Sequence, residues 1–258
     1  MNKRRAVIGI LLAFVAAVSG PRPVLSSEIS LVFSAPKPKT ILFVGNSFVS
    51  ANKGLHNHLR KLTQSVFPGS SGEFFFHSKT KGGARLSDHV SGAEDVIKNY
   101  SHEKKHGPWD LVVLQGQSSE PVRTGGADRF KKAARKLNRR IRASGSQTAF
   151  FMTWAYKGRP EMATALNHAY TRVGENLDAL VVPVGLAFDL ARHSNPAMEL
   201  YARDGKHPSL LGTYLAANVF FATLYGTSPV GASYTAGLSE REAVFAQSIA
   251  LKAVQDYF

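Results

Sequence analysis

Short apolar runs alternate along this chain with segments of helical periodicity, and this alternation limits the possible folds. The apolar runs lie at 41–44, 74–76, 111–114, 149–154 and 180–184. Between and after them, apolar residues recur every three or four positions, which predicts helices over 55–66, 86–100, 130–141, 161–177, 210–225 and 240–257. Strands that alternate with helices form a parallel sheet covered on both faces. We therefore expect a three-layer α/β/α sandwich with a central, mostly parallel five-stranded sheet.

The first 26 residues differ from the rest of the chain. The basic segment MNKRR precedes an apolar run from Ala6 to Val18, and small residues and prolines follow. This order is typical of a secretory signal. The apolar run is shorter than the ~20 residues of a membrane-spanning helix, although an uncleaved anchor is the alternative. The sequence thus predicts a signal at 1–26, a lead-in at 27–39, one domain at 40–258, and a periplasmic or secreted protein.

Charge and cysteine content restrict the partners. The chain has no Cys, which excludes a cysteine nucleophile and Cys-ligated zinc. Its net charge is +14, and the predicted signal holds four Lys or Arg and no acid, which leaves 14 − 4 = +10 for the mature protein. Such a charge favours contact with anionic cell-surface polymers, or it serves solubility alone. For a secreted protein we expect no nucleic-acid partner, and the sequence does not fix the oligomeric state.

Ser47 is the first residue of chemical interest, because the segment Gly45-Asn46-Ser47-Phe48 directly follows the first apolar run. In parallel α/β folds, ligands bind at the carboxyl ends of the strands. A serine hydroxyl becomes a nucleophile when a neighbouring base takes its proton. The alternative is a helix N-cap, which Asn46 or Ser47 would supply for the helix that follows.

A second candidate segment, Asp204-Gly205-Lys206-His207-Pro208, lies near the carboxyl end of the chain. His207 can act as a general base near neutral pH. Asp204 can hold the imidazole in the required tautomer and stabilise its cation. Pro208 disfavours helical structure at His207 and so keeps it in a loop. The alternative is again a helix cap, which Asp204 or Ser209 would supply for the helix at 210–225.

Two further loops can donate hydrogen bonds to a developing oxyanion. Gly82-Gly83 follows the second apolar run, and a glycine there brings a backbone N–H close to a substrate. Gln115-Gly116-Gln117-Ser118 follows the third run, and an amide side chain can donate to the same oxygen. Each segment is also consistent with an ordinary turn or polar loop.

Together and in this order, the four segments resemble the sequence blocks of the SGNH/GDSL hydrolases, over residues 39 to 225. The first block reads ILFVGNSF at 41–48, with Asn46 where many members have Asp. The last is Asp204 and His207. The third departs from the usual Gly-x-Asn-Asp: Gln117 stands where the Asn would be, and Gln115 is a second candidate. The match is closest to a bacterial branch with a GNS first block and a Leu-Gln-x-Gln-Ser third block.

The resemblance implies a flavodoxin-like SGNH hydrolase fold and a serine esterase that needs no cofactor or metal. Ser47, His207 and Asp204 would be catalytic, and the oxyanion hole would consist of the Ser47 and Gly83 N–H groups and the Gln117 amide. Small-molecule or polysaccharide esters are the implied substrates, with O-acetyl groups as one class and lipid esters as a rival. Because the third block has Gln117 in place of the usual Asn, an alternative stays open. The chain could be a catalytically impaired module that binds cell-surface glycan or a partner protein.

The remaining signals are weaker. Asn46, Gln115 and Trp154 are candidates for the substrate pocket, although Trp154 would equally serve core packing. His56-Asn57-His58 fits a solvated helix face better than a metal site. His89 would line the pocket or, more simply, cap or pack. The final set consists of basic residues opposite the apolar positions of 130–141, which predict a solvated face or a polyanion-binding patch: Lys131, Lys132, Arg135, Lys136, Arg139 and Arg140.

Overall fold

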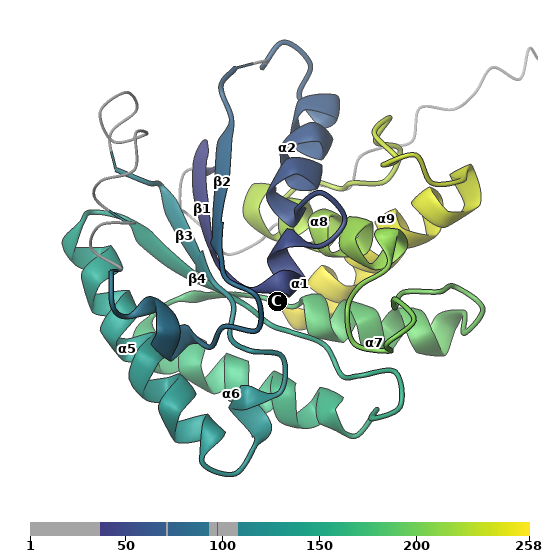
Figure 1. The fold of residues 1–258 in the computed structure, drawn as a ribbon. Helices are drawn as coiled ribbons and strands as arrows, with labels where there is room; N and C mark the ends of the chain where they lie inside the picture. Colours follow the sequence, from purple (N-terminus) through teal and green to yellow (C-terminus); the bar gives the residue numbers. More distant parts are fainter. Residues whose placement is uncertain (1–36, 71, 93–96, 98–107) are drawn as a thin grey trace, which may run out of the picture.

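A parallel five-stranded sheet forms the centre of the computed structural model, which describes residues 37–70, 72–92, 97 and 108–258. All four strand pairings are parallel, and the strand order is β2-β1-β3-β4-β5. The predicted three-layer α/β/α architecture is confirmed (Figure 1). The predicted signal at 1–26 lies outside the described residues. The strands are β1 (Thr40–Gly45), β2 (Phe75–Thr80), β3 (Leu111–Leu114), β4 (Gln147–Phe151) and β5 (Leu180–Val182).

Helices cover both faces of the sheet (Figure 1). Alternate residues of β1 point to opposite sides, so that Phe43 and Val44 belong to different hydrophobic clusters. One cluster joins the sheet to α5 (Gly126–Ala143) and α6 (Met162–Leu177). The other joins it to α2 (Leu55–Val66), α7 (Val184–Ser194), α8 (Leu210–Tyr225) and α9 (Glu240–Tyr257). Among the described residues, no helix has the length and apolar character needed to cross a bilayer.

Three strands differ in length from the sequence-based expectation, and β5, which ends two residues early at Val182, differs least. β2 covers Phe75 to Thr80 and so ends four residues after the apolar run at 74–76. Of its residues, only Phe76 is buried. Because β2 is an edge strand, its polar residues give no continuous apolar signal. β4 ends at Phe151, so the expected strand residue Trp154 lies in the loop after it.

The helices differ in four places. The predicted helix at 86–100 is wrong at its start, where the structure has a single 3₁₀ turn, η1 (Leu86–His89); residues 93–96 and 98–107 lie outside the described part. Short helix α1 (Ser47–Ser50), 3₁₀ turn η2 (Glu120–Val122) and α7 have no clear sequence signal. A Cβ on Gly185, at the start of α7, would lie 2.3 Å from the Thr153 carbonyl oxygen. This tight packing, rather than helix propensity, explains the glycine there.

Candidate active site

Ser47 is the first residue of α1 and lies at the carboxyl end of the sheet. We call residues 45–47, which join β1 to α1, the Ser47 turn. Asn46 caps α1, since its side-chain oxygen accepts a hydrogen bond from the Phe48 N–H at 3.0 Å. The Asn46 N–H in turn donates to Gln115 Oε1 at 2.9 Å. A Cβ on Gly45 would lie 2.5 Å from that same oxygen. The turn therefore requires glycine at position 45, and it leaves the Ser47 side chain half-buried at the surface.

Ser47, His207 and Asp204 form one chain of hydrogen bonds. Ser47 Oγ lies 2.8 Å from His207 Nε2, although 160 residues separate them in sequence. His207 Nδ1 lies 2.5 Å from Asp204 Oδ2. Asp204 Oδ1 also accepts the backbone N–H groups of Lys206 and His207, each at 2.9 Å. The bonds to the His207 side chain and to the two N–H groups lower the pKa of Asp204 from 3.8 to about 2.

A series of stacked aromatic rings packs against His207. Its imidazole contacts the edge of Phe48, with ring centroids 5.4 Å apart. Phe48 stacks on Trp154 at 4.5 Å, and Trp154 stacks on Phe188 at 4.1 Å. Trp154 Nε1 donates to the Lys206 carbonyl oxygen at 3.0 Å. Trp154 is a core residue, because only 1% of its surface is exposed. Of the two roles that the sequence suggested for it, core packing is therefore the correct one, and it does not line a substrate pocket.

The Gly82-Gly83 loop lies directly beside the Ser47 turn. The Ala84 carbonyl oxygen accepts a hydrogen bond from Asn46 Nδ2 at 2.9 Å, and the Lys81 N–H donates to the Gly45 carbonyl at 3.2 Å. Gly83 has a φ of +66°, a conformation that favours glycine. Its exposed N–H bonds to no residue that the structure describes. This N–H is therefore free to bind a substrate oxygen.

The two glutamines of the third block have different environments. Gln115 is fully buried; its Oε1 accepts the Asn46 N–H and its Nε2 donates to the Gly116 carbonyl. Gln117 is half-buried, and its Nε2 donates to Ser118 Oγ at 3.1 Å. Asn46 is also buried, at 3% exposure. Asn46 and Gln115 thus support the Ser47 turn and do not line a substrate pocket, which corrects that expectation. Within the described residues, no hydrogen bond joins Gln117 to Ser47, His207 or Asp204.

Asn52 has no sequence signal, yet it connects the two halves of the site. Its Nδ2 lies 2.9 Å from the carbonyl oxygens of Pro208 and Ser209 and 2.8 Å from Thr213 Oγ1. Its own carbonyl oxygen is 2.7 Å from His58 Nε2. Asn52 has a φ of +52°, an uncommon conformation for a residue with a side chain. Such strained residues cluster at active sites, where surrounding contacts hold them. Asn52 therefore fixes the His207 loop relative to α1.

We expect Asn52→Asp to lower kcat by about 10- to 100-fold with little change in KM, because small misplacements of catalytic groups have effects of this size. A carboxylate has the same shape but donates no hydrogen bond, so it would be repelled by the Pro208 and Ser209 carbonyls. The measurement is steady-state hydrolysis of p-nitrophenyl acetate, with thermal unfolding to verify folding.

The matched control is Lys53→Gly. Lys53 also has a positive φ, +71°, and its exposed side chain makes no hydrogen bond to a described residue. Glycine there removes the same kind of strain without removing a link to the His207 loop. We expect this variant to keep wild-type kcat. Unchanged kcat in a folded Asn52→Asp protein would contradict the positioning role.

The expected solvated face at His56 and His58 is wrong for His58, which is buried and lies 2.8 Å from the Tyr234 hydroxyl. Burial, followed by the charges of His77 and Arg60, lowers the pKa of His56 to about 4. In the described part of the chain, no group of three or more His, Asp or Glu side chains is arranged to hold a metal ion.

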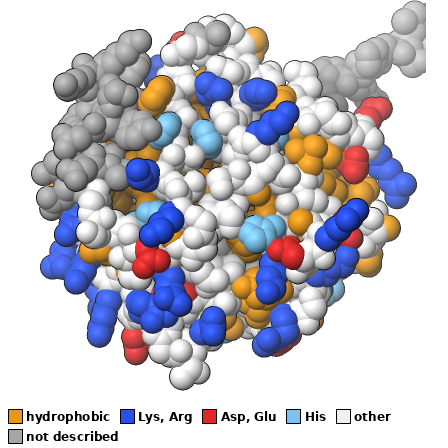
Figure 2. All heavy atoms as spheres, viewed as in Figure 1, with side chains coloured by type: hydrophobic (Ala, Val, Ile, Leu, Met, Phe, Trp, Pro, Cys, Tyr) orange, Lys and Arg blue, Asp and Glu red, His pale blue; other side chains and the backbone are white. Residues whose placement is uncertain are grey.

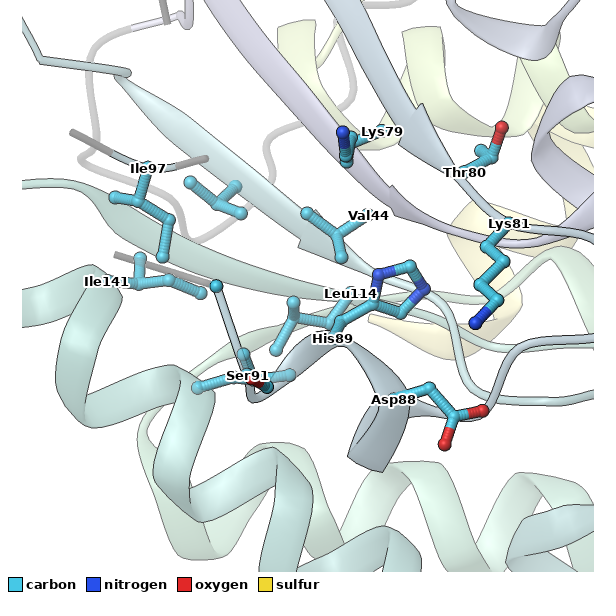
Figure 3. Close-up of a pocket in the computed structure, with 13 residues that line it drawn as sticks. Val44, Lys79, Thr80, Lys81, Asp88, His89, Ser91, Ile97, Leu114 and Ile141 are labelled. Carbon is cyan, nitrogen blue, oxygen red and sulfur yellow. The ribbon is translucent and has the colours of Figure 1, made fainter. Parts of the chain in front are cut away.

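His89 packs against the Ser47 turn. Its Nε2 lies 2.9 Å from the Gly45 carbonyl oxygen, where it can donate a hydrogen bond. Figure 3 shows its ring beside Val44 and Leu114, in the wall of a cavity of about 340 Å³. A second cavity of about 980 Å³ lies among residues at the amino ends of β3 and β4. Neither Ser47 nor His207 lines either cavity, so the chain of hydrogen bonds from Ser47 to Asp204 lies outside both.

Comparisons with known proteins identify the fold. No family model matches the sequence, and no curated protein does. A structure assigned as an SGNH hydrolase, from Slackia heliotrinireducens, has 27% identity and a TM-score of 0.58, over 71% of this chain and 97% of that one. A DUF4886 family protein from Bacteroides uniformis has 18% identity and a TM-score of 0.63, over 83% and 93%. The acetyl xylan esterase AlAXEase has 15% identity and a TM-score of 0.57, over 70% and 98%. The fold of this chain is that of the SGNH/GDSL hydrolases.

Proposed function

We propose that this protein is a serine esterase in which Ser47 is the nucleophile, His207 the general base and Asp204 its partner. The observation that carries the proposal is the continuous hydrogen-bond chain from Ser47 Oγ through the imidazole to Asp204. Because His207 Nε2 lies within hydrogen-bond distance of Ser47 Oγ, it can take the hydroxyl proton as that oxygen attacks a carbonyl carbon. The ionised Asp204 stabilises the imidazolium that results.

The proposed reaction has two halves. Ser47 Oγ bonds to the ester carbonyl carbon while its proton moves to His207 Nε2. The tetrahedral intermediate then breaks the bond to the alcohol, which leaves with that proton. Water repeats the sequence on the acyl-enzyme, giving the carboxylic acid and free Ser47. The N–H groups of Ser47 and Gly83 would hold the oxyanion, and the Gln117 amide would join them after rotation away from Ser118.

An ester on a large, hydrated substrate fits the site better than a lipid. The side chains of His207 and Asp204 are 42% and 44% exposed, so the catalytic groups face solvent. A polymer chain can lie across such a surface and present a small acyl group to Ser47. One protein of similar fold is an acetyl xylan esterase. We therefore propose O-acetyl groups on polysaccharide as the substrate class. The basic and apolar segment at the start of the sequence supports a periplasmic or secreted location.

The test is hydrolysis of p-nitrophenyl esters of increasing chain length, together with labelling by a p-nitrophenyl phosphonate. We expect acetyl esters to be the best substrates and the phosphonate to inactivate the enzyme with one adduct, mapped to Ser47 by mass spectrometry. His207 is the only neighbour that Ser47 Oγ bonds among the described residues, so the adduct should form only while the protein is folded. An adduct elsewhere, or none, would overturn the proposal.

The second candidate is a catalytically impaired module that binds glycan. The bond from Gln117 Nε2 to Ser118 Oγ favours it, because an amide held within its own loop donates nothing to an oxyanion. Loss of one oxyanion donor costs about 10²–10³ in rate, so slow turnover would still point to the esterase. Glycan binding without hydrolysis of any acetyl ester would point to the module.

A further inference from the structure

Helix α5 presents a row of cations to solvent on the side away from the sheet. Lys132, Arg135, Lys136 and Arg139 are exposed, and none makes an ion pair or hydrogen bond with a described residue. Figure 2 shows Lys and Arg side chains gathered over the region of α5, with few Asp and Glu among them. Lys132, Arg135 and Arg139 lie on one side of the helix and span roughly 10 Å along its axis.

This arrangement disfavours the isolated helix. Lys132 and Lys136 are four residues apart, as are Arg135 and Arg139, and like charges at this spacing repel. By contrast, the exposed Lys252 on α9 does have a carboxylate neighbour, since it lies 2.9 Å from Asp256. A row without such neighbours is complementary to an external polyanion.

The positive surface continues from α5 to the catalytic groups. Arg129, in the first turns of α5, lies 2.7 Å from the buried Glu120, and Arg85 lies 4.0 Å from the same carboxylate oxygen. Arg85 and Lys81 are exposed and flank Gly83, the proposed oxyanion donor. The carboxylate that both arginines contact is thus hidden from solvent. Asp88, which follows Arg85 in the chain, is exposed and lies beside Lys81 (Figure 3).

We propose that the substrate is an ester of an acidic polysaccharide that docks along a basic surface; this proposal rests on the proposed function. The basic surface consists of Lys81, Arg85, Lys132, Arg135, Lys136 and Arg139. The carboxylates of the polymer contact the α5 cations while its ester reaches Ser47 beside the Lys81–Arg85 loop. The exposed catalytic groups leave room for a chain that continues in both directions.

The apolar side chains of α5 argue for a hydrated polymer and against a membrane. A helix that binds a bilayer surface inserts an apolar face into the lipid. The apolar residues of α5, including Phe130, Leu137 and Ile141, are instead buried against the sheet. The large exposed hydrophobic residues of the described chain lie elsewhere, at Leu210, Val230, Val244 and Phe258.

The experiment measures binding of polygalacturonate, with neutral dextran and anionic phosphatidylglycerol vesicles as comparison probes. One variant carries Lys132→Gln, Arg135→Gln and Arg139→Gln on α5. The matched control carries Lys61→Gln, Arg241→Gln and Lys252→Gln, three exposed cations of α2 and α9 on the other face of the sheet. We expect the α5 variant to raise Kd for polygalacturonate about tenfold or more at low salt, and the control less than about twofold.

Wild-type protein should bind polygalacturonate and not dextran, with affinity that falls as salt is added. On acetylated polygalacturonate, kcat/KM should fall in the α5 variant in step with binding. The docking surface is overturned if polygalacturonate does not bind, if both triple variants weaken binding equally, or if vesicles are preferred. Hydrolysis of p-nitrophenyl acetate, which is too small to reach α5, tests the proposed function separately.

Discussion

Replacement of Ser47 by alanine is expected to lower kcat by about 10⁵–10⁶, the size of effect seen when a catalytic serine is removed from a triad enzyme. Ser47 Oγ bonds only His207 among the described residues, so the substitution removes the nucleophile and little else. The N–H groups of the proposed oxyanion hole remain in place, and some catalysis above the uncatalysed rate should persist. The measurement is hydrolysis of p-nitrophenyl acetate against a protein-free blank.

The matched control is Ser50→Ala. Ser50 is an exposed serine at the other end of α1, and it makes no side-chain hydrogen bond to a described residue. This variant should keep wild-type activity and a wild-type unfolding temperature. If folded Ser47→Ala kept more than a few per cent of the activity, another nucleophile would have to be sought.

Asp204→Asn is expected to lower kcat by up to about 10⁴ while KM stays near its wild-type value. An amide oxygen can still accept the Lys206 and His207 N–H bonds, so the loop should keep its shape. It cannot stabilise the imidazolium that forms when Ser47 attacks. The matched control is Asp189→Asn, which neutralises an aspartate that also faces a histidine, His193 at 3.8 Å, but has no serine beyond it.

The same carboxylate gives a pH signature. The folded pKa of Asp204 is about 2, below its ordinary 3.8, so its contribution to stability is present above pH 3.8 and is lost as pH falls toward 2. Wild type should therefore be more stable than Asp204→Asn near neutrality, with a gap that closes on acidification. The gap should be small, because solvent screens a side chain that is 44% exposed. A constant gap in unfolding temperature from pH 6 to pH 2 would contradict this assignment.

The sheet could be predicted because its central strands are buried on both faces. Every residue of β1 and β3 is buried, and this produces the continuous apolar runs at 41–44 and 111–114. β2 could not be delimited, since an edge strand exposes residues such as Lys79. α7 was missed because its first residues, Val184 and Gly185, continue the apolar run of β5.

The residues of the candidate site likewise fall into two groups: those that the sequence identified and those that it did not. Asp204 and His207 are three residues apart, and Ser47 follows a recognisable strand, so local patterns identified them as candidates. The roles of Asn52 and Gln115 depend on contacts with residues 156 and 69 positions away in the chain. No local pattern records such contacts, and their discovery required the folded chain.

The sequence separations within the site also bear on how the protein folds. The Asp204–His207 contact closes a loop of a few residues and can form early, at little cost in chain entropy. The contact between Ser47 and His207 joins positions 160 residues apart and requires most of the sheet between them. During refolding, recovery of reactivity toward a phosphonate should therefore lag behind secondary structure. Covalent labelling of Ser47 by the phosphonate would therefore measure how much of the protein has formed the complete sheet.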